Sequence, residues 1–374
     1  MIRVGIIGYG YMGQFHKKKI VQSGQASVVA ILDKEQRRRE EGLSDGYHVY
    51  SERQLETFFK ETMDLVIVAT KIEERAYYAT QAMTAGFHVL CEKPVAMNMK
   101  ELEEIIAISD KTGKKFTVHQ PRRFDRDYLM LKEVIDSHVI GDVHTIESRV
   151  HGERGILFGW RGREKSGGGL LNDWGTHLID QYLQLFPEEK VIRIECRLRS
   201  ILVEDVEDYV ELNLTFSNNV YAKIVLTTFA LCEMPRWFAL GNRGTLRLDD
   251  MTGENGSIVR LKTEVDVEEL SKRGSVAPSL TLAPLDNLYK EKIPLPNEGD
   301  TTMCFWNSLI AALKGEGEFL VKTEDTIRQM KILEAARLSS ETNQSVDVKF
   351  QISVIPKLRS YTCPTSAMWL SSTL

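Results

Sequence analysis

A lysine at the end of an expected strand is the first residue that could do chemistry. Glu92-Lys93-Pro94 follows the apolar run 87–91. The residue before a proline is pushed out of the α region, so Lys93 stays on extended backbone instead of continuing into a helix. An ammonium held there can stabilise negative charge that develops on a reacting oxygen, which often dominates catalysis. We therefore predict that Lys93 is catalytic.

A carboxylate and an imidazole form a second candidate pair. Residues 167–177 begin with three glycines, which indicate backbone close to a ligand or another chain segment. Asp173 and His177 are four residues apart where an apolar-periodic helix opens, so they share a helix face. A carboxylate holding an imidazole can take a proton from an alcohol near neutral pH. The pair would also arise if Asp173 capped the helix and His177 packed below it.

A glycine-rich loop near the N-terminus indicates a nucleotide site. Residues 8–13 read Gly-Tyr-Gly-Tyr-Met-Gly, between an expected strand at 2–7 and an expected helix at 14–23. In this context GxGxxG predicts dinucleotide binding. Gly8 allows the tight turn, Gly10 lets the pyrophosphate approach, and Gly13 lets helix and strand pack. The helix N-terminus then faces the phosphates.

An acidic residue favours NAD over NADP. Asp33 ends the expected strand 27–32, twenty residues past Gly13, where a carboxylate accepts hydrogen bonds from the adenosine ribose. A 2′-phosphate would be repelled there. Lys34 and the arginine run 37–39 could screen such a phosphate, although a solvated helix face also explains them. We predict NAD, with NADP not excluded.

Alternation of strands and helices predicts a doubly wound parallel sheet, a Rossmann α/β fold. Further strands are expected at 64–69, 87–91 and 116–119, with helices at 73–85 and 101–112. Ligands of such sheets bind at the carboxyl ends of the strands. Gly8, Asp33, Thr70, Lys93 and His119 stand at such ends, so we expect them to converge.

After Pro121 the pattern changes to alternating strands. We expect strands at 143–150, 209–216, 220–229, 237–241 and 245–248, and helices at 128–137, 301–314 and 324–342. Residues 271–296 look like a loop. The predicted domains are a dinucleotide-binding domain at 1–122, an α+β domain with a large, mostly antiparallel sheet at 123–350, and a tail of uncertain structure at 351–374. We expect the sheet's open face to form a homodimer or homotetramer.

Composition limits the partners. A chain of 374 residues with net charge −5 gives no reason to expect nucleic acid or an anionic membrane as partner. No apolar run approaches the length of a membrane span, and residues 2–7 are too short for a signal peptide. Five scattered cysteines without metal-type spacing favour reduced thiols and a cytoplasmic location, and we expect no metal site.

Three motifs together resemble one family. Residues 8–13, Glu92-Lys93-Pro94 and residues 167–177 occur in the order and approximate spacing of the Gfo/Idh/MocA oxidoreductases, which include inositol and sugar dehydrogenases. Residues 118–125 resemble the segment that closes the family's cofactor domain, and residues 334–342 resemble its C-terminal helix. The resemblance covers about residues 1–350.

The resemblance implies a mechanism and a set of site residues. Lys93 would donate a hydrogen bond to the reacting oxygen, His177 would take the hydroxyl proton, and Asp173 would bind substrate and tune the basic pair. Hydride would pass from the carbinol carbon to the nicotinamide. The residues expected at the cofactor are Gly8, Gly10, Tyr11, Met12, Gly13, Asp33, Thr70, Glu92, Lys93 and His119. Those expected at the substrate are Lys93, Arg122, Trp160, Arg161, Asp173 and His177.

Two segments depart from the pattern or extend it. The family usually has Thr-Pro-Asn-x-x-His after the third strand, whereas Lys71 and Arg75 stand at the proline and histidine positions here. Arg161 and Arg163, just before the triple glycine, could suit a carboxylate or phosphate on the substrate. They could equally bridge the domains.

The leading hypothesis is an NAD(P)-dependent oxidoreductase that acts on a secondary hydroxyl or ketone of a sugar, cyclitol or derivative. One alternative is an NAD-dependent glycoside hydrolase that works through transient oxidation. Another is a non-catalytic regulator that senses a dinucleotide, against which the presence of Lys93, Asp173 and His177 together speaks.

Overall fold

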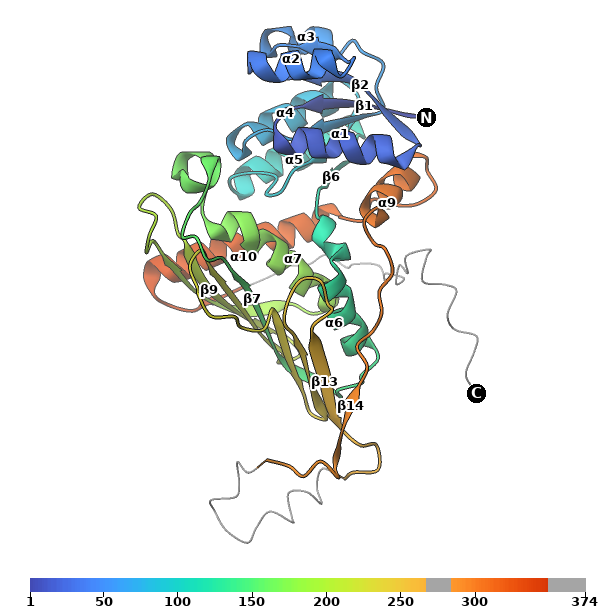
Figure 1. The fold of residues 1–374 in the computed structure, drawn as a ribbon. Coiled ribbons are helices and arrows are strands. Elements are labelled where there is room, and N and C mark those ends of the chain that lie inside the picture. Colours follow the sequence, from blue (N-terminus) through green and yellow to red (C-terminus); the bar gives the residue numbers. More distant parts are fainter. Residues whose placement is uncertain (267–283, 349–374) are drawn as a thin grey trace.

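Two sheets dominate the molecule (Figure 1). The computed structural model describes residues 1–266 and 284–348. A six-stranded parallel sheet is built from the first 118 residues, and a nine-stranded, mostly antiparallel sheet from the remainder. The predicted fold class is therefore confirmed. The expected tail 351–374 lies outside the described residues.

The first sheet has the doubly wound order β3-β2-β1-β4-β5-β6, and all its strands are parallel. Its strands are β1 (Ile2–Ile7), β2 (Ala26–Leu32), β3 (His48–Tyr50), β4 (Leu65–Val68), β5 (His88–Cys91) and β6 (Phe116–Val118). Its helices are α1 (Tyr11–Ser23), α2 (Gln36–Ser44), α3 (Leu55–Phe58), α4 (Ile72–Thr84) and α5 (Met99–Thr112). Because helices cover both faces, β4 is buried at every position. The strand order reverses beside β1, which places a ligand crevice at the carboxyl ends of β1 and β4.

The second sheet runs in the order β14-β13-β12-β11-β7-β10-β9-β8-β15. Its strands are β7 (Val143–His151), β8 (Val191–Arg199), β9 (Tyr209–Phe216), β10 (Tyr221–Thr227), β11 (Trp237–Gly241), β12 (Gly244–Leu248), β13 (Gly256–Leu261), β14 (Lys290–Ile293) and β15 (Val346–Asp347). All neighbours are antiparallel except β7 and β10. Every second residue of β9 is buried, so one face of the sheet packs against a core.

Helices α6 (Arg126–Asp136), α7 (Thr176–Leu185) and α10 (Thr323–Thr342) cover one face of this sheet (Figure 1). The Tyr182 hydroxyl on α7 donates to the carbonyl of Ile146 on β7 at 3.0 Å. Helix α10 also reaches the first sheet's layer, where a carboxylate oxygen of Glu334 accepts the backbone N–H of Met99 at 2.8 Å. Helix α9 (Cys304–Leu313) returns to pack on α1. These helices join the two sheets.

Several elements of the structure differ from those predicted from the sequence. The expected loop 271–296 contains strand β14, which pairs with β13; residues 271–283 of it lie outside the described part. Strand β14 has only four residues, two lysines and a glutamate among them, so its local pattern resembles a loop. Strands β3, β8, β13 and β15 were also missed. The alternation of apolar and charged residues in β8 could have identified it.

Candidate active site

The three motif glycines have different surroundings. Gly8 has φ +92°, and a Cβ there would lie 2.8 Å from the Ala69 carbonyl oxygen. A Cβ on Gly13 would lie 2.0 Å from the Gly8 carbonyl oxygen, whereas one on Gly10 would meet nothing within 4 Å. Gly8 and Gly13 are therefore required by packing. Open space above Gly10, at the N-terminus of α1 beside Tyr11 and Met12, fits the phosphates of a dinucleotide.

Asp33 lies at the end of β2, beside the glycine loop. Its carboxylate accepts the backbone N–H groups of Tyr9 at 2.6 Å and Glu35 at 2.8 Å. A carboxylate has about four acceptor sites, so capacity remains for ribose hydroxyls. The neighbouring arginines are engaged elsewhere: Arg38 pairs with Glu41 of α2, and Arg39 donates to the Asp33 carbonyl at 3.0 Å.

Lys93, which follows a strand of the first sheet, contacts Asp173, which lies just before a helix that covers the second sheet. The Lys93 ammonium follows β5 and donates to the backbone carbonyl of Asp173 at 2.5 Å and to its Oδ1 at 3.3 Å. The other oxygen, Oδ2, accepts from Arg161 Nε at 2.7 Å. Both Lys93 and Asp173 side chains are about nine-tenths buried. One carboxylate thus joins two cations that are far apart in the sequence.

Burial and charge set the protonation of this group. Burial lowers the pKa of Lys93, although Asp173 opposes the change. Burial disfavours ionisation of Asp173, but Lys93 and Arg161 outweigh it and lower the pKa of that carboxyl. Burial also lowers the pKa of His177 well below its usual range, and the nearby charges of Lys93 and Arg122 add to this. His177 is therefore neutral at pH 7, while Asp173 is ionised.

A chain of amides orients His177. Its Nδ1 lies 3.1 Å from the amide oxygen of Gln120. The Gln120 amide nitrogen donates to Gln329 at 3.2 Å, and the Gln329 amide nitrogen donates to the Thr176 carbonyl at 2.7 Å. With the Gln120 oxygen thus turned toward the ring, Nδ1 carries the proton and Nε2 is free to accept one. Nε2 makes no hydrogen bond to the described residues.

The sequence predicted that the Asp173 carboxylate would hold the His177 imidazole, and this prediction is wrong. Among the described residues, the two side chains bind other partners. The Asp173 carboxylate binds Lys93 and Arg161, and the imidazole binds Gln120. Asp173 stands in a π-helical turn, Leu171–Gly175, before α7 begins. This i→i+5 turn breaks the 3.6-residue spacing on which the expectation depended.

Two other residues expected at the substrate lie around this group. The Arg122 guanidinium lies 4.0 Å from the centre of the Trp174 ring, and that ring lies 6.1 Å from the His177 ring. Trp160 packs against Arg161 at 4.9 Å. Aromatic rings therefore hold both guanidinium groups near the Lys93–Asp173 contact.

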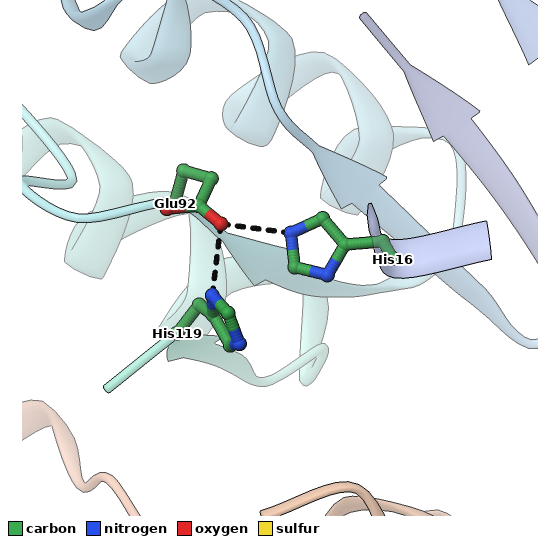
Figure 2. A group of neighbouring side chains, drawn as sticks. All are labelled: His16, Glu92 and His119. Atoms are coloured by element: carbon green, nitrogen blue, oxygen red, sulfur yellow. Dashed lines mark hydrogen bonds and ion pairs between the residues drawn. The ribbon is translucent and has the colours of Figure 1, made fainter. Parts of the chain in front are cut away.

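Glu92, the residue before Lys93, belongs with His119 and His16 to a buried cluster (Figure 2). One oxygen of Glu92 lies 2.8 Å from His119 Nδ1 and 2.8 Å from Nε2 of His16 on α1. Trp306 packs over both imidazoles. Burial opposes ionisation of Glu92, but the two imidazoles outweigh it and keep the pKa of that carboxyl well below its usual range.

Among the described residues, this cluster is the one group of three His, Cys, Asp or Glu side chains close enough to hold a metal ion. The imidazole nitrogens that face Glu92 both donate to its carboxylate, so hydrogen bonds account for the arrangement. His16 was missed by the sequence reading. Its place three residues after Gly13, on the same side of α1, is the signal that could have found it.

Thr70 lies two residues after β4, and Arg75 binds its backbone carbonyl. Arg75 is 5% exposed and donates to the Thr70 carbonyl at 3.0 Å and to the Pro94 carbonyl at 2.5 Å. It forms no ion pair with the described residues. Arg75, at the position of the family's histidine, therefore ties the ends of β4 and β5 together beside Lys93.

A cavity of about 690 Å³ opens beside Asp173, Trp174 and Arg161. The ends of β7 and β10 and residues 152–158 form its other walls. This volume is in the range of small-molecule sites. Of the residues expected at the substrate, Asp173 and Arg161 line the cavity; Lys93 contacts Asp173, and Arg122 and His177 lie beside Trp174.

Comparison with known proteins identifies the family. The model of the oxidoreductase family with an NAD-binding Rossmann fold, GFO_IDH_MocA, matches residues 2–120, and that of the GFO/IDH/MocA C-terminal domain matches residues 128–247. The crystal structure of an NAD-binding protein from Listeria innocua aligns with a TM-score of 0.82 and 31% identity, over 92% of this chain and 96% of that one. The chain belongs to the Gfo/Idh/MocA oxidoreductases.

Curated members of this family span most of the chain. An uncharacterized oxidoreductase of Schizosaccharomyces pombe, C115.03, is 28% identical and covers 76% of this chain and 82% of its own. The scyllo-inositol 2-dehydrogenase (NADP(+)) IolW of Bacillus subtilis is 24% identical and covers 92% and 95%. The protein is thus an oxidoreductase-family member with an NAD(P)-binding Rossmann domain. No helix in residues 1–266 or 284–348 is long and apolar enough to cross a membrane.

Proposed function

We propose that the protein is an NAD(P)-dependent dehydrogenase that transfers hydride between a nicotinamide and a secondary hydroxyl or ketone of a sugar, cyclitol or derivative. The supporting observation is the contact of Lys93, which follows β5, with Asp173, which precedes a neutral His177 by four residues. The similarity to IolW, named as an inositol dehydrogenase, agrees with a polyol or sugar substrate.

The proposed chemistry uses each side chain for one task. The bound nicotinamide would accept or supply the hydride. Lys93 would donate a hydrogen bond to the oxygen on the reacting carbon and stabilise its developing negative charge. His177 would take the hydroxyl proton at Nε2, because its Nδ1 is committed to Gln120. Asp173 would hold the Lys93 ammonium in place and bind substrate.

The cofactor proposed is NAD. Asp33 retains acceptor capacity for the ribose hydroxyls, and its negative charge would repel a 2′-phosphate. Arg38 is held by Glu41, so it is not free to offset that charge. IolW is named for NADP, so both cofactors belong in the test. A clear preference for NADP would contradict this assignment.

The test is a panel of polyols, sugars and their derivatives, followed by NADH or NADPH absorbance. At least one member should be oxidised, and Lys93→Ala should lower kcat by about 10²–10³-fold. Lys132→Ala is the control, because that lysine lies on α6 and pairs with Asp136. Unchanged kcat in Lys93→Ala would contradict the role of Lys93. Turnover without NADH release would instead support glycoside cleavage through transient oxidation.

The proposed assembly is a homodimer or homotetramer through the open face of the nine-stranded sheet. Helices cover the opposite face, and Tyr221 on β10 is 37% exposed on the open one. Light scattering after gel filtration should give at least twice the chain mass of 42.6 kDa, and Tyr221→Arg should reduce it. We propose a cytoplasmic location, in line with free thiols at Cys91, Cys196 and Cys232. Microscopy of a fluorescent fusion tests it.

A further inference from the structure

The cavity beside Asp173 is lined by four charged side chains, two cations and two carboxylates. These are Glu153, Arg154, Arg161 and Asp173, and His151 lines the cavity beside them. Burial lowers the pKa of His151, so its ring is neutral at pH 7. Its buried Nε2 has no hydrogen-bond partner. Glu153 and Asp173 are therefore the two carboxylates that face the cations of this cavity.

Arg161 has donors to spare. Its Nε binds Asp173 at 2.7 Å, and its plane packs on Trp160. Its terminal nitrogens make no hydrogen bond to the described residues, and its side chain is 41% exposed. The planar fork of a guanidinium matches the geometry of a carboxylate or phosphate. The Nε edge of the Arg161 guanidinium is therefore held by Asp173, and its terminal nitrogens remain available to bind a ligand.

Arg154 is the second free cation. Within the described chain it forms neither an ion pair nor a hydrogen bond, and its side chain is exposed in the cavity wall. Arg154 and Arg161 line the cavity together with Glu153 and Asp173, whereas Lys93 contacts Asp173 from outside the lining. Because Lys93 and Arg161 already share the Asp173 carboxylate, Arg154 and the free edge of Arg161 remain available to bind an anionic group on the substrate.

The geometry also relates the anion to the reacting group. Lys93 and Arg161 bind opposite oxygens of the Asp173 carboxylate. A single sugar ring can therefore reach both cations, with a hydroxyl at Lys93 and an anionic substituent at the free edge of Arg161. Arg163 differs from Arg161 in this respect, because its side chain is exposed and does not line the cavity.

From these contacts we infer that the substrate is an anionic sugar derivative, a sugar carboxylate or a sugar phosphate, whose charged group binds Arg161 and Arg154. The inference rests on the proposed function and specifies its substrate class. An alternative role for Arg161, in which it only orients Asp173, would affect neutral and anionic sugars alike. The ratio of kcat/KM for an anionic sugar to that for its neutral parent therefore separates the two roles.

The experiment compares glucose with glucuronate and with glucose 6-phosphate in the presence of NAD. The wild-type ratio should favour at least one anionic member by about tenfold or more. Arg154→Gln and Arg161→Gln should each lower that ratio about tenfold, mainly through KM, because a charged hydrogen bond is lost. Glu153→Gln should raise it, and Arg163→Gln should keep it. The preferred member tells a carboxylate from a phosphate.

Calorimetric titration of glucuronate and glucose 6-phosphate into the protein with NADH bound separates failure of this inference from failure of the proposed function. Anion binding that Arg154→Gln weakens, without NADH formation on any sugar, would keep the anion site and remove the dehydrogenase proposal. Equal turnover of neutral and anionic sugars would overturn the inference and leave the dehydrogenase. A ratio unchanged in Arg154→Gln and Arg161→Gln would overturn it as well.

Discussion

In the proposed mechanism His177 takes the hydroxyl proton, and two neighbours other than the expected Asp173 orient its ring. The Gln120 amide oxygen accepts a hydrogen bond from the Nδ1–H of His177, and hydrogen bonds to Gln329 keep the Gln120 amide from flipping. A base is useful at the pH where it is unprotonated, and burial holds the pKa of His177 well below the ordinary value of 6.5.

The first prediction concerns the pH dependence of kcat/KM. The proposed mechanism requires neutral His177 and protonated Lys93, and burial lowers the pKa of both groups. As pH falls, His177 stays neutral until below 6.5, so the acid limb should lie below that value. As pH rises, Lys93 should lose its proton below the ordinary value of 10.5. Steady-state rates with the best substrate across this range check both limbs, and an acid limb above pH 6.5 would contradict the role of His177.

The second prediction concerns the amide chain. Gln120→Leu removes the acceptor that selects the His177 tautomer, so kcat should fall by at least about tenfold. Gln329→Leu should produce a smaller fall, because it frees the Gln120 amide without removing it. Nitrogen NMR of the histidine ring should show a mixed tautomer in Gln120→Leu. A single Nδ1–H tautomer in that variant would show that Gln120 does not select it.

At the scale of elements, the glycine loop offers a matched pair of variants. Gly13→Ala would press a methyl group against the Gly8 carbonyl, so Tm should fall by several degrees. Gly10→Ala meets open space and has φ −71°, so Tm should stay within about 2 °C. The methyl group would fill the space proposed for the pyrophosphate, so NADH affinity should fall at least about tenfold. Thermal unfolding and calorimetric titration measure the two effects, and unchanged NADH affinity in Gly10→Ala would move the phosphate site elsewhere.

Arg75 joins two strand ends, and the loop that carries Lys93 depends on it. Arg75→Ala leaves the Thr70 and Pro94 carbonyls without this donor, which should cost about 1–3 kcal/mol each where they stay buried. It also removes a positive charge that helps to lower the pKa of Lys93.

A further prediction concerns two effects of replacing Arg75: the change in kcat, and the change in the alkaline limb of the pH profile of kcat/KM. In Arg75→Ala, kcat should fall and the alkaline limb of kcat/KM should move to higher pH, since the Lys93 ammonium becomes easier to keep. Arg75→Lys should restore the limb more than the rate, because it returns a charge without the fork. Arg53→Ala, on the exposed surface near α3, is the control. A lower rate with an unmoved limb would reduce Arg75 to a purely structural role.

At the scale of the whole molecule, one buried arginine clamps three elements together. Arg123 follows β6 and donates two hydrogen bonds to Asp180 on α7, at 2.8 and 2.7 Å, and one to Asp325 on α10 at 3.1 Å. Its side chain is 6% exposed. The clamp lies where the first sheet's layer meets the helices of the second, so it holds the Lys93 side of the site against the Asp173 side.

Breaking this clamp should be costly, since it leaves a buried charge with one partner fewer. Asp180→Asn should lower the free energy of unfolding by about 3–5 kcal/mol. Asp136→Asn, which breaks an exposed pair with Lys132, should change it by less than about 1 kcal/mol. Urea denaturation followed by tryptophan fluorescence compares them. Equal effects of the two substitutions would refute the clamp.

The sequence by itself determined the elements whose signal is local. The alternation in β9 predicted its bounds, Tyr209–Phe216, because a strand with one buried face repeats every two residues. The glycine spacing predicted the loop before α1, since a tight turn and close packing need glycine at particular positions. Lys93 was selected because a proline follows it, and the resemblance to a family connected it with Asp173.

Only the tertiary structure decided which side chains meet. Lys93 and Asp173 are 80 residues apart, Gln120 and Gln329 are 209 apart, and Glu92 and His16 are 76 apart. The π-helical turn at Leu171–Gly175 and the bridge from Arg75 to Pro94 likewise depend on packing. Local patterns specify the period of an element and where it ends. The partners of a buried polar group depend instead on which distant elements the core brings together, and burial then requires that group to find a partner among them.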